Sequence, residues 1–240
     1  MPAQNSDGYY MKMKPLLMSG IEKERAYYEK VLIQHITQPK TEQLLNEART
    51  EFENLLLKLP YIGNETNVLA AGFVSAAWCL GFFRSLEREG LTLREIAKMM
   101  YEKMEHDAES KSPDKKRKLK EFYFSPAMRG AEVERSAESL SRKYPGDWVS
   151  EYVEGDGENF DFGINFTECA IHKFFKQHDA LRYTPIFCLS DYATYRAFDI
   201  GFKRTQNIVL GASACEFRFK KDWETPRGWP PEDLEEGISF

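Results

Sequence analysis

Residues 147–166 read DWVSEYVEGDGENFDFGINF, and this stretch decides the fold class. Its first nine residues point alternately to two sides of an extended chain, which is typical of a half-buried β-strand. The turn sequence GDGEN at 155–159 then leads into FDFGINF at 160–166, so the two runs predict a β-hairpin. Two further strands are expected at 201–210 and 214–221, joined by the short turn GASA. The C-terminal part therefore predicts an antiparallel sheet of about four strands.

The chain before this hairpin is dominated by helical patterns. Apolar residues at helical spacing or in continuous runs predict helices at 22–36, 41–59, 68–89, 92–106 and 131–144, and another helix is expected after the hairpin at 166–178. Thr92 and Glu95 form a capping box that marks one helix start, and Gly90 is placed to end the helix before it. The sum is an α+β fold, with a helical N-terminal half packed on the C-terminal antiparallel sheet.

The chain of 240 residues is long enough to bury a substantial core. We expect an N-terminal extension with a helix at 1–40 and a single α+β domain at 41–222. The remaining residues, 223–240, are rich in proline and acid and predict an irregular tail. No pattern in the sequence indicates an oligomeric state.

Charge and hydropathy argue against several classes of partner. The net charge is −5, and the only basic run, KSPDKKRKLK at 111–120, is interpreted as a solvated loop or helix start, so no nucleic-acid partner is expected. The apolar run at 68–83 is shorter than the about 20 residues of a membrane-spanning helix, so no membrane partner is expected either. The N-terminus lacks the pattern of a signal peptide, which predicts a cytoplasmic protein.

Three of the four cysteines, Cys169, Cys188 and Cys215, lie in the last third of the chain. Thiols are the most reactive side chains near neutral pH, so this grouping suggests chemistry, whereas Cys79 lies in an apolar run and is interpreted as packing. No CxxC pair occurs, and cytoplasmic thiols stay reduced, so no disulfide framework is expected. A zinc site made of the three cysteines and either Asp191 or His172 is an alternative, but such scattered ligands fit no local template, so no cofactor or metal is expected.

The C-terminal region resembles the L-2-amino-thiazoline-4-carboxylic acid hydrolase family. The hallmark of that family is an ordered set: a tryptophan-led strand, a glycine-preceded TEC, a C-x-x-D, an RT, and a G…C-x-F-R ending. These elements occur here as Trp148, Gly163, Glu168, Cys169, Cys188, Asp191, Arg204, Thr205, Gly211, Cys215, Phe217 and Arg218. The upstream LPYIG and the helix rich in small residues that follows it are also similar, so the resemblance covers about residues 60–220.

The resemblance implies a cytoplasmic hydrolase that acts on a C–N or C–S bond of a small, cyclic, amidine-like substrate. The founding activity of the family opens 2-aminothiazoline-4-carboxylate, which would give a carbamoyl-cysteine product. The domain at 41–222 is then hydrolase-like. The chain is also distantly similar to small-molecule-binding domains of the 4-vinyl reductase type, so a non-catalytic binding domain is the alternative function.

Ring opening requires a nucleophile at the carbon between nitrogen and sulfur, and a thiolate could supply it. Cys169 is one candidate, because His172 lies one turn along the expected helix and would favour the thiolate if protonated. Cys188 and Asp191 form a second unit, in which the carboxylate would raise the pKa of the thiol. Asp191 is therefore a better general acid or base than an activator of Cys188. The alternative for Asp191 is an N-cap on a helix starting at Tyr192.

The remaining site candidates depend on the predicted sheet. Cys215 alternates with Phe217 and Phe219 on one strand face, so it is either a third catalytic thiol or an inward-pointing small residue. Arg204 could hold a substrate carboxylate by a paired hydrogen bond, or an acidic neighbour such as Glu168. Arg204, His172 and Glu168 are the candidate substrate-binding residues, and Cys169, Cys188, Asp191 and Cys215 are the candidate catalytic ones.

Overall fold

The structure, a computed structural model, describes residues 8–34 and 36–240. The chain divides into two compact units, which are described separately. The helical unit comprises residues up to Ile96 together with Tyr144–Gly146 and Phe174–Ala180. The sheet unit comprises Ala97–Lys143, Asp147–Lys173 and Leu181–Phe240. All the site candidates lie in the sheet unit.

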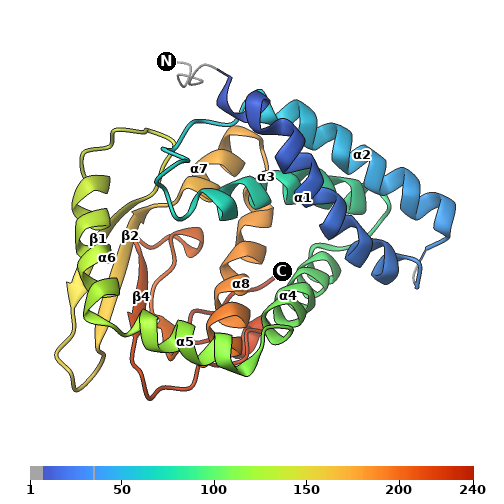
Figure 1. The fold of residues 1–240 in the computed structure, drawn as a ribbon. Coiled ribbons are helices and arrows are strands. Elements are labelled where there is room, and N and C mark those ends of the chain that lie inside the picture. Colours follow the sequence, from blue (N-terminus) through green and yellow to red (C-terminus); the bar gives the residue numbers. More distant parts are fainter. Residues whose placement is uncertain (1–7, 35) are drawn as a thin grey trace. The chain divides into compact units, whose positions relative to one another are not determined.

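The helical unit is built from α1 (Tyr9–Leu32), α2 (Gln38–Leu56) and α3 (Ala70–Arg88) (Figure 1). Helix α3 carries the apolar run of the sequence and is buried along most of its length, as its composition predicted. Helix α1 begins well before the expected start at residue 22. That prediction was wrong because Pro15 and Gly20 interrupt the helical signal, although Pro15 is accommodated inside the helix.

Helices α2 and α3 are in close contact at Gly81. A Cβ atom on this residue would lie 2.8 Å from the carbonyl oxygen of Ala48, closer than packed atoms approach. Gly81→Ala should therefore force α3 away from α2 and lower the free energy of unfolding by about 1–3 kcal/mol, as overpacking of a core does. Gly72→Ala on the same helix is the matched control, because a Cβ atom there would meet nothing within 4 Å. Urea unfolding of both variants, followed by circular dichroism, should show the loss in Gly81→Ala alone.

The sheet unit supplies the four strands and most of the remaining helices. In chain order its elements, with those that straddle the two units, are α4 (Leu93–Glu109), α5 (Pro113–Tyr123), α6 (Pro126–Ser139), β1 (Val149–Glu154), β2 (Phe162–Glu168), α7 (Ala170–Gln177), α8 (Thr184–Ala197), β3 (Phe202–Arg204) and β4 (Cys215–Phe219). Helix α4 starts at the predicted capping box, where the N–H of Glu95 donates to Oγ1 of Thr92. Gly90 ends α3 with a φ of 92°, a conformation that suits glycine.

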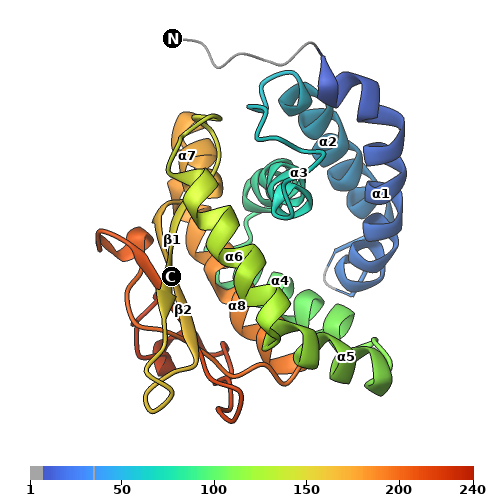
Figure 2. The same ribbon diagram turned by 60° about the vertical axis from the view of Figure 1, so that its left-hand side comes forward.

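The strands form one antiparallel sheet in the order β1-β2-β4-β3. The predicted hairpin is confirmed as β1 and β2, and the α+β class is confirmed with it. The register sets Cys215 opposite Phe166, and Arg204 opposite Phe217, so both Cys215 and Arg204 lie on the face that carries Phe217. Helices α6 and α8 cover this face (Figure 2).

An aromatic cluster fills the space between this face and the helices. Tyr123 of α5 packs edge-on against Phe219, with ring centroids 5.1 Å apart, and Tyr195 of α8 does the same at 5.1 Å. The two tyrosine hydroxyls are 3.1 Å apart and share a hydrogen bond. Phe162 of β2 stacks on Phe219 at 4.9 Å. The cluster fixes α8 over β3 and β4, and α8 carries Cys188 and Asp191.

Two helices were not predicted as such. The basic run at 111–120 is largely α5, which starts after an N-cap at Ser112 and has no fully buried residue, although its last residue, Tyr123, joins the aromatic cluster. Helix α8 was expected only in part, as a helix that starts at Tyr192, and Asp191 lies inside it rather than at its start. The N-cap interpretation of Asp191 is therefore wrong. In the described part of the chain, no helix is long and apolar enough to cross a membrane.

Candidate functional site

A buried guanidinium forms the centre of the candidate site. The Arg204 side chain, at the end of β3, is 1% exposed. Its Nε and Nη2 donate to the Glu236 carboxylate at 2.6 and 2.7 Å, and its Nη1 donates to Oδ2 of Asp191 at 2.8 Å. A further Nη2 hydrogen bond reaches the carbonyl of Cys188 at 2.9 Å. Four of the five N–H groups of this arginine are thus in use, and they connect β3, α8 and the C-terminal segment.

Asp191 is the carboxylate of this group that is accessible. Its side chain keeps 31% of its surface exposed, whereas that of Glu236 keeps 1%. Partial burial raises the pKa of Asp191 to about 6, the Arg204 charge opposes the rise and the Glu236 charge adds to it. Within the described residues, Oδ1 of Asp191 makes no hydrogen bond. A carboxylate that titrates near neutral pH and has a free oxygen is suited to proton transfer.

Two of the three late cysteines meet at Asn207. Sγ of Cys215 lies 3.6 Å from Oδ1 of Asn207, and Sγ of Cys188 lies 3.9 Å from the same oxygen. The N–H of Ile208 also donates to Sγ of Cys215 at 3.3 Å. Burial raises the pKa of Cys188 to about 12 and that of Cys215 to about 11, and the Asp191 charge adds to both. Both groups are therefore thiols at neutral pH.

Cys169 joins this cluster from the other side, at the start of α7. Its carbonyl accepts the N–H of Lys173 at 3.0 Å, so Cys169 occupies the N-cap position of that helix. Burial raises the pKa of the thiol to about 11, but the backbone N–H groups of His172 and Ile171 lower it. The side chain is partly exposed and interacts electrostatically with Asp191 and Cys188. The predicted cysteines and Asp191 thus converge although up to 46 residues separate them.

His172 and Glu168, which the sequence suggested as substrate-binding residues, have other contacts in the structure. The interaction of His172 with Cys169 is made by its backbone N–H. Glu168, the last residue of β2, forms ion pairs with Lys173 and with Arg142, the latter at 3.0 Å. These cations, Lys173 first, lower the pKa of Glu168. Glu168 thus holds the start of α7 beside the end of β2.

On the opposite sheet face, the Arg218 side chain packs over the backbone of Gly163. A Cβ atom on Gly163 would lie 2.9 Å from the carbonyl oxygen of Phe217 and 3.0 Å from Cδ of Arg218. The glycine therefore lets the Arg218 side chain cross β2 and donate to Oδ1 of Asn165 at 2.8 Å. This arrangement braces the sheet below the candidate site.

Two residues of the site were missed by sequence reasoning. Asn207 lies two residues after Thr205 of the RT pair and caps the short 3-10 helix Ile208–Leu210. An asparagine near the end of an expected strand is a weak indication of such a cap. Glu236 gave no usable signal, because it is one of several acids in a segment without periodicity. Within residues 8–34 and 36–240, no group of three or more His, Cys, Asp or Glu side chains is placed to hold a metal ion.

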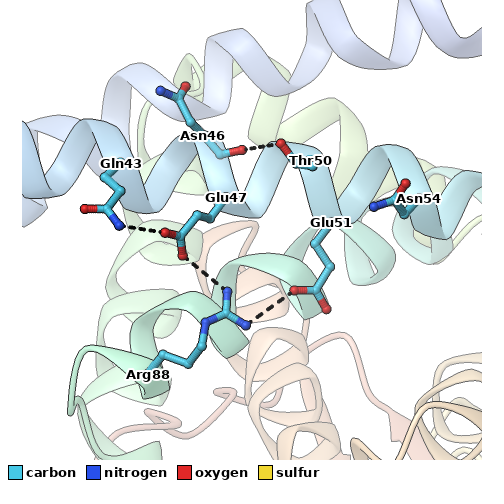
Figure 3. A pocket seen from close by; sticks show the side chains of 7 residues that line it. All are labelled: Gln43, Asn46, Glu47, Thr50, Glu51, Asn54 and Arg88. Carbon is cyan, nitrogen blue, oxygen red and sulfur yellow. Dashed lines mark hydrogen bonds and ion pairs between the residues drawn. The ribbon is translucent and has the colours of Figure 1, made fainter.

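The helical unit has a hollow of its own, of about 590 Å³, on the surface of α2 (Figure 3). Its lining is polar, and Arg88 of α3 reaches Glu47 at 3.4 Å and Glu51 at 3.8 Å. These side chains satisfy one another's charges and include no nucleophile with an adjacent base. The Cys–Asp–Arg cluster of the sheet unit is therefore the stronger candidate for chemistry.

Residues 73–219 match the model of the L-2-amino-thiazoline-4-carboxylic acid hydrolase family. The match covers more than half of the chain and contains the three late cysteines, Asp191 and Arg204. No curated protein and no solved structure matches the chain. The family name suggests hydrolase activity. On the extent of this match, the chain belongs to the L-2-amino-thiazoline-4-carboxylic acid hydrolase family.

Proposed function

We propose that this protein is a hydrolase that opens a small heterocyclic amidine, such as 2-aminothiazoline-4-carboxylate, to a carbamoyl-cysteine product. One observation carries the proposal: Cys169, a half-buried residue at a helix N-terminus, and Asp191, a carboxylate with a pKa of about 6, belong to one cluster. A nucleophile and a proton-transfer group are the two parts that opening such a ring requires. The family membership supports the same reaction class.

In the proposed reaction, ionised Asp191 accepts the thiol proton of Cys169, directly or through a water molecule. The Cys169 sulfur bonds to the carbon between the ring nitrogen and the ring sulfur. The bond from this carbon to the ring sulfur then breaks, the electron pair leaves with the sulfur, and Asp191 returns the proton to it. The product of this step is a free thiol on the substrate and an isothiourea that links the substrate carbon to Cys169.

Water completes the reaction in a second step. A water molecule adds to the isothiourea carbon, with Asp191 taking its proton, and the bond to the Cys169 sulfur breaks. The Cys169 thiolate recovers its proton from Asp191, and the substrate leaves as N-carbamoyl-cysteine. The backbone N–H groups of His172 and Ile171 favour the thiolate that forms at both ends of this cycle.

The remaining candidates take supporting roles in this proposal. Cys188 and Cys215 line the site next to Asn207 and stay protonated. Arg204 orients Asp191, and its one N–H group that is left over offers a single hydrogen bond to a substrate carboxylate. Glu168 has a structural role, because its ion pairs with Lys173 and Arg142 hold the start of α7, where Cys169 lies, beside the end of β2.

The proposed function is tested with purified protein and 2-aminothiazoline-4-carboxylate. Product mass and new thiol are followed together, because addition of water leaves the mass the same whichever ring bond breaks. A new free thiol indicates that the C–S bond opened, and the same mass without a thiol indicates that the C–N bond opened. Binding of the compound without turnover would contradict the proposal and would indicate a non-catalytic small-molecule-binding domain instead.

Asp191→Asn should lower kcat by about 10²–10⁴-fold, the usual contribution of a general acid or base. In the wild-type protein, Asp191 acts as the base in its ionised form, so kcat should rise with pH through about 6, its raised pKa. The variant should lose this acid limb from its pH–rate profile. Asp199→Asn is the control, because Asp199 is an exposed residue just after α8 that forms an ion pair with Lys120. An unchanged acid limb in Asp191→Asn would assign the proton transfer to another group.

A further inference from the structure

The C-terminal segment, residues 223–240, has little regular structure but is held firmly against the sheet unit. Oγ1 of Thr225 accepts the N–H of Phe202 at 2.8 Å and donates to the carbonyl of Ile200 at 2.6 Å. Further along, Leu234 and Ile238 are 4% and 1% exposed. The segment is therefore packed on both sides of Glu236, although it lies outside the family match, which ends at residue 219.

The Glu236 carboxylate is the deepest charged group of this segment. Its side chain is 1% exposed, and it accepts two hydrogen bonds from Arg204. It also accepts Nδ2 of Asn207 at 3.0 Å, and the amide oxygen of that asparagine faces the sulfurs of Cys188 and Cys215. A single carboxylate thus touches both the residue that holds Asp191 and the residue that holds two of the cysteines.

We propose that Glu236 is a positioning residue of the hydrolase site, which acts on the reaction through Arg204 and Asp191. This inference rests on the proposed function. Two carboxylates compete for one guanidinium, and Glu236 takes its Nε and one Nη2 hydrogen, whereas Asp191 takes a single Nη1 hydrogen. Because a carboxylate gains most from a paired contact with arginine, Glu236 receives the larger share of the positive charge. Arg204 therefore holds Asp191 in place, but it stabilises the ionised form of Asp191 less than a guanidinium without a second carboxylate would.

The electrostatics agree with this division. The Glu236 charge raises the pKa of Asp191, while the Arg204 charge lowers it. The other titratable groups that interact electrostatically with Asp191 come from α5, α7, α8 and β4, and they are Tyr123, Cys169, Cys188, Tyr192, Tyr195 and Cys215. None of these is a cation or a second carboxylate, so among the described residues Arg204 and Glu236 are the ionised groups that shift the pKa of Asp191.

Glu236→Gln tests the inference, because it removes the charge and keeps the shape. Asp191 is then the one carboxylate bound to the Arg204 guanidinium, which stabilises its ionised form more strongly. The pKa of Asp191 should therefore fall by about 1 or more. The acid limb of the kcat profile should move to lower pH by the same amount, with KM unchanged within about twofold. Glu235→Gln, at the exposed neighbouring residue, is the matched control and should leave the profile in place. Glu236→Asp keeps the charge and should keep the acid limb near that of the wild-type protein.

A second readout does not depend on turnover. The carboxyl carbon of Asp191, assigned through Asp191→Asn in ¹³C-labelled protein, should titrate at lower pH in Glu236→Gln than in the wild type. This result together with a protein that hydrolyses nothing would keep the role of Glu236 and reject the proposed function. An unmoved titration of Asp191 would overturn the role of Glu236, whatever the activity. A lower KM with an unmoved profile would overturn it as well, because Glu236 would then occupy the place of a substrate carboxylate.

Discussion

Cys169→Ala should lower kcat for ring opening by about 10⁴-fold or more, because it removes the atom that bonds to the substrate carbon. The side chain is small and partly exposed, so the fold should survive the change. The measurement is single-turnover formation of new thiol from 2-aminothiazoline-4-carboxylate. The Cys169 thiolate is favoured by two backbone N–H groups at the start of α7, whereas that of Cys215 is favoured by one, the N–H of Ile208.

Alanine variants of the other cysteines sharpen this prediction. Cys188→Ala and Cys215→Ala should lose less activity than Cys169→Ala, because both of these thiols contact Asn207 and neither lies at the start of α7. Cys79→Ala is the control for the loss of a buried thiol elsewhere, since Cys79 lies in α3 of the helical unit. If Cys169→Ala retains activity within about tenfold of the wild type, a role as the nucleophile is excluded.

Arg204→Leu should lower the free energy of unfolding by about 3–5 kcal/mol, because it leaves a charged Glu236 buried without its partner. The Glu236 side chain is 1% exposed, so water cannot replace the arginine as its partner in the folded protein as it stands. The measurement is urea unfolding at neutral pH, followed by tryptophan fluorescence. A control on the opposite sheet face is Arg218→Leu, which breaks hydrogen bonds to neutral groups and a partly exposed ion pair with Glu216, and it should cost less.

The double variant Arg204→Leu, Glu236→Gln separates the lost charge pair from lost packing. Removal of both charges should recover much of the stability that Arg204→Leu loses, because a buried pair is often no more stable than neutral groups of similar shape. If the double variant is as unstable as Arg204→Leu, the packing of the arginine stem accounts for the loss. A loss below about 1 kcal/mol in Arg204→Leu would contradict the buried ion pair itself.

The elements that sequence reasoning found are those with a strong local period. Alternation along 147–155 predicted β1, and the capping box at Thr92 and Glu95 predicted the start of α4. The first half of α8 was missed because the helix sequence, TPIFCLSDYATYRA, mixes apolar and polar residues. Its buried positions are set by contacts with β3 and the aromatic cluster, and not by a stripe that the sequence displays.

The candidate site shows the same division. The cysteines, Asp191 and Arg204 could be selected from the sequence, because they are chemically reactive or charged and match a family pattern. Their convergence depends on the sheet register and on α8, which no local pattern encodes. Glu236 could not be predicted, since its contact with Arg204 spans 32 residues and joins a strand end to an irregular segment.

The covalent step at Cys169 is tested most directly by mass. Wild-type protein mixed with excess 2-aminothiazoline-4-carboxylate is quenched in acid at increasing times and mapped by peptide mass spectrometry. The proposed mechanism predicts a transient mass increase of one whole substrate molecule on the peptide that contains Cys169, and no such increase on the peptides with Cys188 or Cys215. Turnover in which Cys169 remains unmodified at every time would contradict the account. An adduct on another cysteine instead of Cys169 would contradict it as well.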